Sequence, residues 1–237
     1  FSAIANIILQ QGDTSRAIEY LEKTISSNPN NPLNHINKAN LLLTIKDTTK
    51  AIESYNSGLN LDSTNAEVLS SLAGIYIAQR QYKKADMLLN KKLQHHKADQ
   101  NTAIQSAFLQ FKLSNYDSAR QSFYQIAQND PNHYMAYNYI SLIEYQKKQY
   151  DSAVWYAEKA LSLNNEAKES MLTLARVKDI NKQYYNALVQ YDKIIKLDST
   201  YTIAKVEKAN IQKKINNLAR SKQQERAPEI PQIQQRF

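Results

Sequence analysis

Six alanines recur along this chain at intervals of 34 residues, with no slippage over the series. A second series of small residues lies twelve positions ahead of the first. The first series is Ala17, Ala51, Ala85, Ala119, Ala153 and Ala187, and the second is Ala5, Ala39, Ala73, Ala107, Ser141, Ala175 and Ala209. A fixed period of this length predicts a stack of helical hairpins.

Helix packing explains why small and large side chains occur at fixed positions of the period. Two helices approach closely only where side chains are small, and a bulky residue one turn later fills the space beside the contact. The bulky residues are Leu21, Tyr55, Leu89, Phe123 and Tyr191, with Ala157 as the exception. Only three glycines and five prolines occur in 237 residues, which suits a chain that is nearly all helix. We therefore predict an all-α fold in which length sets the number of repeats.

Alignment on the alanines divides the chain into six blocks, each with a first helix (helix A), a short polar turn and a second helix (helix B). The blocks are residues 1–31, 32–65, 66–99, 100–133, 134–167 and 168–201. Asp13 and Asp47 stand where a carboxylate caps the start of a helix, and Asp117 and Asp151 fall in a first turn. These four residues predict where helix B begins in their blocks.

The blocks resemble tetratricopeptide repeats, whose motif places small, aromatic, small, large and proline residues in a fixed order. The best match is block 100–133, where Ala107, Tyr116, Ala119, Phe123 and Pro131 are all in register. The resemblance covers residues 1–201. It implies a right-handed superhelical solenoid of stacked antiparallel helix hairpins, acting as a non-catalytic scaffold for protein–protein interaction.

Both ends of the chain depart from the repeat. The chain starts at Phe1, part-way into a unit, so we expect the first unit to be truncated at its N-terminus. Beyond residue 201 the pattern of a helix A continues without a second helix, which predicts a capping helix over residues 202–226. A proline-containing break then predicts a flexible tail over residues 227–237. The third block ends in His95-His96 in place of Asp-Pro, so we expect a looser link to the fourth.

Nothing in the sequence supports catalysis. The chain has no cysteine, which excludes disulfides, thiolate catalysis and zinc–thiolate sites. Its glycines stand isolated within a helical pattern, so they form no phosphate-binding loop. His95 and His96 are adjacent and point about 100° apart on a helix, so they cannot share a metal as an i, i+4 pair can. We expect no enzyme activity, no cofactor and no metal site.

The family resemblance implies that helix A of every unit lines a concave groove. The peptide-binding residues are then expected at Asn6, Ile36, Asn40, Ile104, Phe108, Phe111, Met135, Asn138, Leu142, Tyr145 and Arg176. One branch of the family grips acidic chaperone tails with two asparagines and three cations. The corresponding positions here hold Ser2, Asn6, Asn37, Glu67 and Ser71. Because every cation of that clamp is absent, we exclude chaperone-tail binding.

The middle of the expected groove is apolar. The residues that would gather there are Ile104, Phe108, Phe111, Met135, Leu142 and Tyr145. On one interpretation they anchor a partner segment. On the other they pack helix A against its neighbours, because apolar residues at helical spacing are usually core. Trp155, on helix B of the fifth block, is likewise either an exposed anchor or a partly buried residue.

The formal net charge is +8, and the C-terminal segment carries most of it. Residues 202–237 contain eight Lys or Arg and three Glu. An alternative function is therefore an adaptor to an anionic surface, nucleic acid or membrane headgroups, through the basic C-terminal helix. However, these cations are spread around the helix with glutamines between them, so a solvated cap is the preferred interpretation and nucleic acid is not expected.

The expected partner is thus a protein or peptide, and self-association through the ends of the array is a third alternative. No apolar run approaches the ~20 residues that a transmembrane helix needs. The composition, rich in Lys, Asn, Ile, Tyr and Gln, resembles that of proteins from AT-rich bacterial genomes. The bacterial cytoplasm and the cell envelope (periplasmic and lipid-anchored) both stay open as locations.

Overall fold

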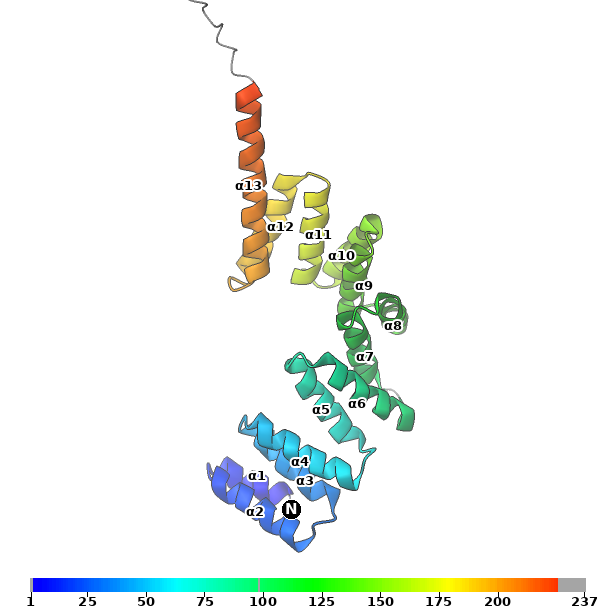
Figure 1. Ribbon diagram of the computed structural model, residues 1–237, viewed down its shortest axis with the longest axis vertical. Helices are drawn as coiled ribbons and strands as arrows, with labels where there is room; N and C mark the ends of the chain where they lie inside the picture. Colours follow the sequence, from blue (N-terminus) through cyan, green and yellow to red (C-terminus); the bar gives the residue numbers. More distant parts are fainter. Residues whose placement is uncertain (1, 98, 226–237) are drawn as a thin grey trace, which may run out of the picture. The chain divides into compact units, whose positions relative to one another are not determined.

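The computed structural model describes residues 2–97 and 99–225, and this part of the chain is helical, with no strand (Figure 1). The odd-numbered helices up to α11 are helices A, and the even-numbered ones are helices B. Their bounds are α1 Ser2–Gln10, α2 Thr14–Ser27, α3 Pro32–Thr44, α4 Thr48–Leu61, α5 Ala66–Ala78, α6 Tyr82–His95, α7 Gln100–Lys112, α8 Tyr116–Asn129, α9 Tyr134–Gln146, α10 Tyr150–Leu163, α11 Lys168–Ile180, α12 Tyr184–Leu197 and α13 Thr202–Glu225. The predicted all-α class and its hairpin repeat are confirmed.

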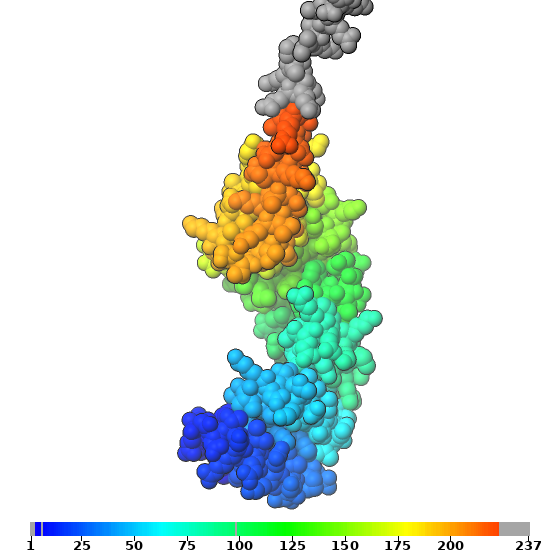
Figure 2. All heavy atoms as spheres, turned by 60° about the vertical axis from the view of Figure 1, so that its left-hand side comes forward, coloured from blue at the N-terminus to red at the C-terminus, as the bar shows by residue number. Residues whose placement is uncertain are grey.

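The chain divides into two compact units, unit 1 (Phe1–Ala119) and unit 2 (Arg120–Phe237), and each is described by itself. In unit 1 the hairpins α1–α2, α3–α4 and α5–α6 form, and each helix B contacts the helix A that follows it. In unit 2 the hairpins α9–α10 and α11–α12 form, and α11 also contacts α9, so these helices A are neighbours. Figure 2 shows α13 (orange) lying against α12 (yellow).

Carboxylates mark the helix starts that the sequence predicted. Asp13 and Asp47 are the N-caps of α2 and α4, and each accepts a backbone N–H of the first turn, at 2.9 Å and 3.2 Å. Asp117 and Asp151 lie in the first turns of α8 and α10, where the helix dipole favours an anion. All four assignments are confirmed.

The turn that follows helix A repeats one backbone motif. A single residue in each such turn has a positive φ: 84° at Gly12, and between 57° and 64° at Lys46, Arg80, Ser114, Lys148 and Lys182. After α3, the N–H of Asp47 donates to the carbonyl of Leu42 and that of Lys46 to Leu43, both at 2.9 Å. This is the Schellman arrangement, which ends a helix. Gly12 therefore lies in the polar turn that the sequence predicted after the first helix, and not within a helix.

Both series of small residues lie in the helix contacts, as the period predicted. Every member is buried except Ala209 on α13, which is exposed. The bulky residues four positions after the first series are buried beside them, and Tyr55, Tyr191 and Phe123 are the largest fully buried side chains. The alternation of small and large side chains therefore fixes how closely the helices of each unit pack.

A polar network joins the third hairpin to the helix that follows it. Lys92 of α6 is buried, with 8% exposure, and its ammonium donates to Ser70 at 2.8 Å, to Asp99 at 2.9 Å and to Thr102 at 2.7 Å. The hydrogen bond from Lys92, with a backbone N–H from Thr102, lowers the pKa of Asp99 to about 2. The sequence led us to expect a looser link at this junction. The structure instead ties α5, α6 and α7 together through one ammonium group.

Helix α13 is longer than any helix A of the repeats. Ala204 and Ile211 on one face are buried in a core with Tyr191 and Ile194 of α12. On another face, Lys205 stands at the register position that buried Met171 holds in α11. The predicted tail, residues 227–237, lies outside the described residues. Within the described ranges, no helix combines the length and the apolar character that crossing a bilayer requires.

Candidate functional site

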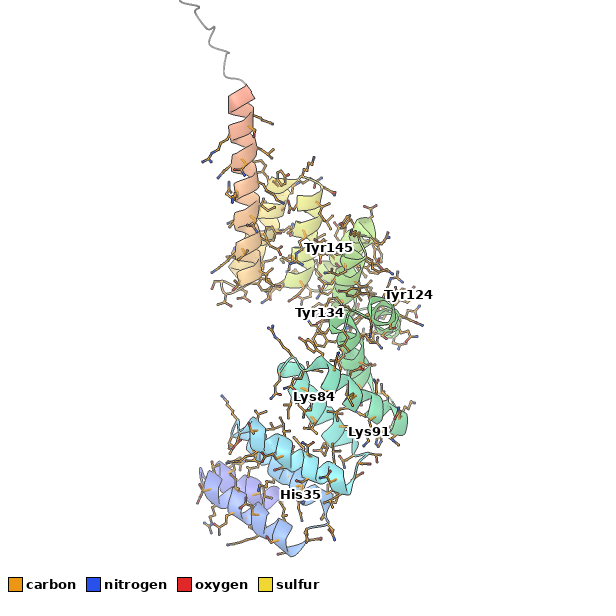
Figure 3. The ribbon with its side chains drawn as sticks, viewed as in Figure 1. His35, Lys84, Lys91, Tyr124, Tyr134 and Tyr145 are labelled. Atoms are coloured by element: carbon orange, nitrogen blue, oxygen red, sulfur yellow. The ribbon has the colours of Figure 1, made fainter. Side chains whose placement is uncertain are left out.

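A cleft of about 500 Å³ opens in unit 2 beside the helices A, α9 and α11, and helix α13. Tyr145 from α9 (labelled in Figure 3) and Arg176 from α11 both line it, and both are residues that the sequence predicted for the groove. Tyr191 reaches the cleft from α12, so one helix B also contributes. The remaining lining residues are Asp179, Ile180, Glu207, Asn210, Lys213, Lys214 and Asn217.

Arg176 is held by a two-point ion pair. Its Nη2 donates to Glu207 Oε1 at 2.6 Å and its Nε donates to Oε2 at 3.0 Å. The hydroxyl of Tyr191 donates to the same carboxylate at 3.0 Å, and the Arg176 guanidinium lies 5.9 Å from the ring centre of Tyr145. These contacts fix Arg176 between an aromatic ring and a carboxylate.

Burial and the Arg176–Glu207 ion pair shift the pKa values of groups in the cleft. The hydrogen bond to Glu207 raises the pKa of the Arg176 guanidinium. Burial, reinforced by the Glu207 carboxylate, raises the pKa of Tyr191 well above its ordinary value. Burial also raises the pKa of Tyr145. At neutral pH the cleft therefore holds neutral tyrosines beside a charged Arg–Glu pair.

A second ion pair lies on the same cleft, where Lys214 donates to both carboxylate oxygens of Asp179 at 2.7 Å. Three further polar side chains of α13, those of Asn210, Lys213 and Asn217, are exposed. Within the described part of the chain, neither Lys213 nor Asn210 has a hydrogen-bonding or ionic side-chain partner. The cleft thus combines a fixed polar wall with side chains that are open to solvent.

The predicted groove residues of the first two blocks are in different surroundings. Asn6 belongs to α1, but its side chain lies outside the described residues. Ile36 is in the core of unit 1 with 1% exposure, so it is not on an open surface. Asn40 accepts a hydrogen bond from the Tyr55 hydroxyl and donates to Glu67 at 3.2 Å. Asn40 is exposed, and its amide already ties α3 to α5.

The three predicted apolar residues of α7, Ile104, Phe108 and Phe111, are half-buried. Phe108 meets Tyr82 edge-on at 6.2 Å, and Phe111 lies 5.9 Å from Tyr116. The Lys112 ammonium is placed over both phenylalanine rings, at 5.2 Å and 5.6 Å. Both rings therefore have packing partners within unit 1.

The predicted residues of α9 divide into buried and accessible ones. Asn138 is buried, with 5% exposure, and accepts a hydrogen bond from the Ser170 hydroxyl at 2.7 Å. It therefore ties α9 to α11 in the interior of unit 2. Met135 is 38% exposed, and Leu142 and Tyr145 are half-buried. On the neighbouring helix B, Trp155 is 58% exposed, which favours the exposed interpretation of this residue.

Sequence reasoning missed the residues that hold Arg176 in place. Glu207 was only counted among the three Glu of residues 202–237, and Tyr191 was assigned to packing alone. The available signal was the register, because Tyr191 occupies the same position as Tyr55 and both carry a hydroxyl.

In the described ranges no three His, Cys, Asp or Glu side chains come together as a metal site would need.

Comparison with known proteins identifies the same kind of repeat in this chain. Two family models, both described as tetratricopeptide repeat, match residues 9–75 and 107–168. The tetratricopeptide repeat-containing protein trd-1 of Caenorhabditis elegans is 23% identical over 157 residues, which is 66% of this chain. The match spans 20% of the length of that protein.

Solved structures share the fold. YrrB, described as a TPR protein with an unusual peptide-binding site, has a TM-score of 0.62 at 19% identity, over 81% of this chain and 99% of its own. PilF of Pseudomonas aeruginosa has a TM-score of 0.64 at 19% identity, over 88% of this chain and 95% of its own. The family generally mediates protein–protein interaction, and its members are typically non-catalytic scaffolds. With its 34-residue register, its hairpins and these matches, the chain belongs to the tetratricopeptide repeat family.

Proposed function

We propose that this chain is a protein–protein interaction scaffold in which the cleft of unit 2 binds a segment of a partner protein. The observation that carries the proposal is the cleft itself, which brings Tyr145 and Arg176 together from neighbouring helices A. Its volume of about 500 Å³ is within the range of volumes that ligand-binding pockets in proteins have. An extended or helical segment laid across α9, α11 and α13 would contact both residues.

The fixed and the open side chains have different roles in this proposal. Arg176 and Asp179 are each neutralised by a partner, so they shape the wall without attracting charge. The exposed amides of Asn210 and Asn217 can pair with backbone groups of the segment, and the Lys213 ammonium favours a carboxylate nearby. Met135 and Leu142 extend the surface along α9, whereas Ile36 and Asn138 serve packing.

The same contacts support a binding role for the cleft over a catalytic one. A catalytic acid or base needs a pKa tuned toward the working pH and access to a substrate proton. In this cleft the two carboxylates are each paired with a cation, and the perturbed tyrosines are shifted away from neutral pH. The arrangement can hold a segment in place without activating it.

We also propose that α13 acts as the cap of the array. In a complete repeat, the face of helix A that meets its helix B carries small residues, such as the buried Ala175 of α11. The equivalent residue of α13 is Ala209, which is exposed. Exposed polar side chains such as Lys205 and Lys213 also cover α13, and a polar surface of this kind suits a terminal helix. The anionic-surface alternative gains no support, because Lys208 and Lys214 are already paired with carboxylates.

The proposal is tested by affinity capture with the full chain and a charge-reversed variant, Lys213→Glu combined with Asn210→Asp. Both residues are exposed, so the variant should fold as the parent does. We expect it to lose partners that the parent retains, as compared by quantitative mass spectrometry. Lys205→Glu, exposed on α13 outside the cleft, is the matched control and should retain them. Equal capture by the parent and the cleft variant would contradict the proposal.

A further inference from the structure

Unit 2 has a second cleft, of about 520 Å³, between α10, the start of α11 and α12. Leu161, Met171 and Leu197 give it apolar walls, and Lys193 and Lys196 stand on its rim. None of its lining residues also lines the cleft beside Arg176. It is therefore a separate feature, and the proposed function does not use it.

The preceding repeat shows how the same place is filled elsewhere in unit 2. The register equivalents of Met171 and Gln190 are Tyr137 and Tyr156, whose rings stack with centres 6.5 Å apart. The equivalent of Lys193 is Lys159, whose ammonium lies 5.8 Å from the centre of the Tyr137 ring. That repeat thus closes the position with two aromatic rings and a cation over one of them.

The third block, in unit 1, fills the equivalent position with leucines. The counterparts of Met171 and Gln190 in the third block are Leu69 and Leu88. Leu69 is fully buried, and Leu88 packs against the core cluster that contains Val68 and Leu72. In the last hairpin a thioether and an amide stand where the third block carries leucines and the fifth block carries aromatic rings. The structure accordingly leaves an open, apolar cleft at this position.

The rim of this cleft is positively charged. Lys193 and Lys196 are exposed, and Glu166 is the one acidic residue among those that line the cleft. Within the described residues, neither ammonium has an ionic or hydrogen-bonding partner. Lys193 also has no ring beneath it, although its equivalent Lys159 does. Two unpaired cations around an apolar floor favour an occupant that is apolar at its tip and acidic beside it.

We propose that this cleft binds an aromatic side chain of a partner protein that carries an acidic residue next to the aromatic one. The ring takes the place that Tyr156 fills in the preceding repeat, against Leu161 and the sulfur of Met171. Lys193 then lies near the ring as Lys159 lies over Tyr137, and the adjacent carboxylate meets Lys196.

The chain offers a direct probe, because it has three methionines, Met87, Met135 and Met171. With methyl-13C-methionine the full chain gives one NMR signal for each. We expect an acetylated and amidated Glu-Phe-Glu tripeptide to shift Met171 alone, with a dissociation constant on the order of millimolar because one ring is buried. Met135 lies by the proposed partner groove and Met87 in unit 1, so the three signals separate the sites.

Two cleft variants, one control variant and two control peptides make the test decisive. Gln190→Tyr rebuilds one ring of the preceding repeat and should weaken binding at least about tenfold. The double variant Lys193→Glu and Lys196→Glu, at two exposed positions, should weaken peptide binding similarly. Lys91→Glu, at the position of unit 1 that is equivalent to Lys193, should not weaken it. Lys91 is labelled in Figure 3. The proposal is overturned if Glu-Ala-Glu or Lys-Phe-Lys shifts Met171 as strongly, or if Glu-Phe-Glu shifts only Met135 or no signal.

Discussion

Tyr55 in unit 1 and Tyr191 in unit 2 occupy the same register position, four repeats apart, and each is buried on a helix B. Each hydroxyl donates a hydrogen bond to a side chain of an adjoining helix, α3 for Tyr55 and α13 for Tyr191. Tyr55 donates to Asn40, which in turn donates to Glu67 at 3.2 Å. Tyr191 donates at 3.0 Å to Glu207, which binds Arg176 at two points. One register position therefore supports a cluster built on an asparagine amide in one unit and a cluster built on an Arg–Glu ion pair in the other.

The difference teaches how a repeat protein makes one region distinct without changing its fold. The period places a tyrosine at both positions, but the residues of the adjoining helices decide what the hydroxyl stabilises. An Arg–Glu pair with two hydrogen bonds is stronger and more directional than an amide contact. In unit 2 this pair also forms one wall of the cleft that we propose for partner binding.

The largest expected difference follows removal of the acidic residue from each cluster. Glu207→Ala leaves the half-buried Arg176 and the Tyr191 hydroxyl without their partner, and we expect a loss of about 2–3 kcal/mol. Glu67→Ala removes one exposed contact and should cost below about 1 kcal/mol. Hydrogen exchange of the backbone amides in α5, α11 and α13 measures both losses of stability. Equal losses would mean that the Arg176–Glu207 ion pair contributes no more to stability than the Asn40–Glu67 hydrogen bond.

Removal of the two hydroxyls gives the next largest effect. Tyr191→Phe deletes a hydrogen bond to a charged group and should destabilise unit 2 by about 1.5 kcal/mol or more. Tyr55→Phe deletes a bond to a neutral amide and should cost about 1 kcal/mol in unit 1. Urea unfolding followed by Trp155 fluorescence reports unit 2, and amide exchange reports unit 1. A larger cost for Tyr55→Phe would reverse the comparison.

The pH dependence is the smallest expected effect. Burial raises the pKa of both tyrosines, and Glu207 adds to the shift at Tyr191. The unfolded chain then loses its phenolic protons first as the pH rises above about 10. The stabilisation is therefore complete below pH 10 and declines above it, more steeply for Tyr191. Unfolding measured between about pH 9 and 11 should show a weaker decline in Tyr191→Phe than in the parent. An identical decline would contradict the assigned pKa shift.

The fold could be predicted from the sequence because each of its signals is local or periodic. Asp13 and Asp47 cap helices that start beside them, and the alanines recur at each contact. The sequence predicted a short polar turn after each helix A but not its left-handed residue, because that residue varies between repeats, as at Gly12, Arg80 and Ser114. Backbone hydrogen bonds determine that conformation.

The site was predictable only in part, because its contacts join residues about one repeat apart. Tyr145 and Arg176 were placed correctly on helices A, but burial of Ile36 and Asn138 depends on the neighbouring helices against which they pack. The ion pair of Arg176 with Glu207, like that of Lys92 with Asp99, needs the position of a second element. A repeat pattern specifies a face of a helix, whereas it does not specify which side chains meet across it.

The most direct test of the partner-binding cleft is site-specific photocrosslinking in the native cells. Photoreactive p-benzoylphenylalanine replaces Lys213, which lines the cleft, or in a separate protein Gln212, which is exposed about 100° further round α13. The account predicts a defined partner adduct from position 213 and a much weaker one from position 212. Equal adducts at both positions, or an adduct from 212 alone, would contradict it.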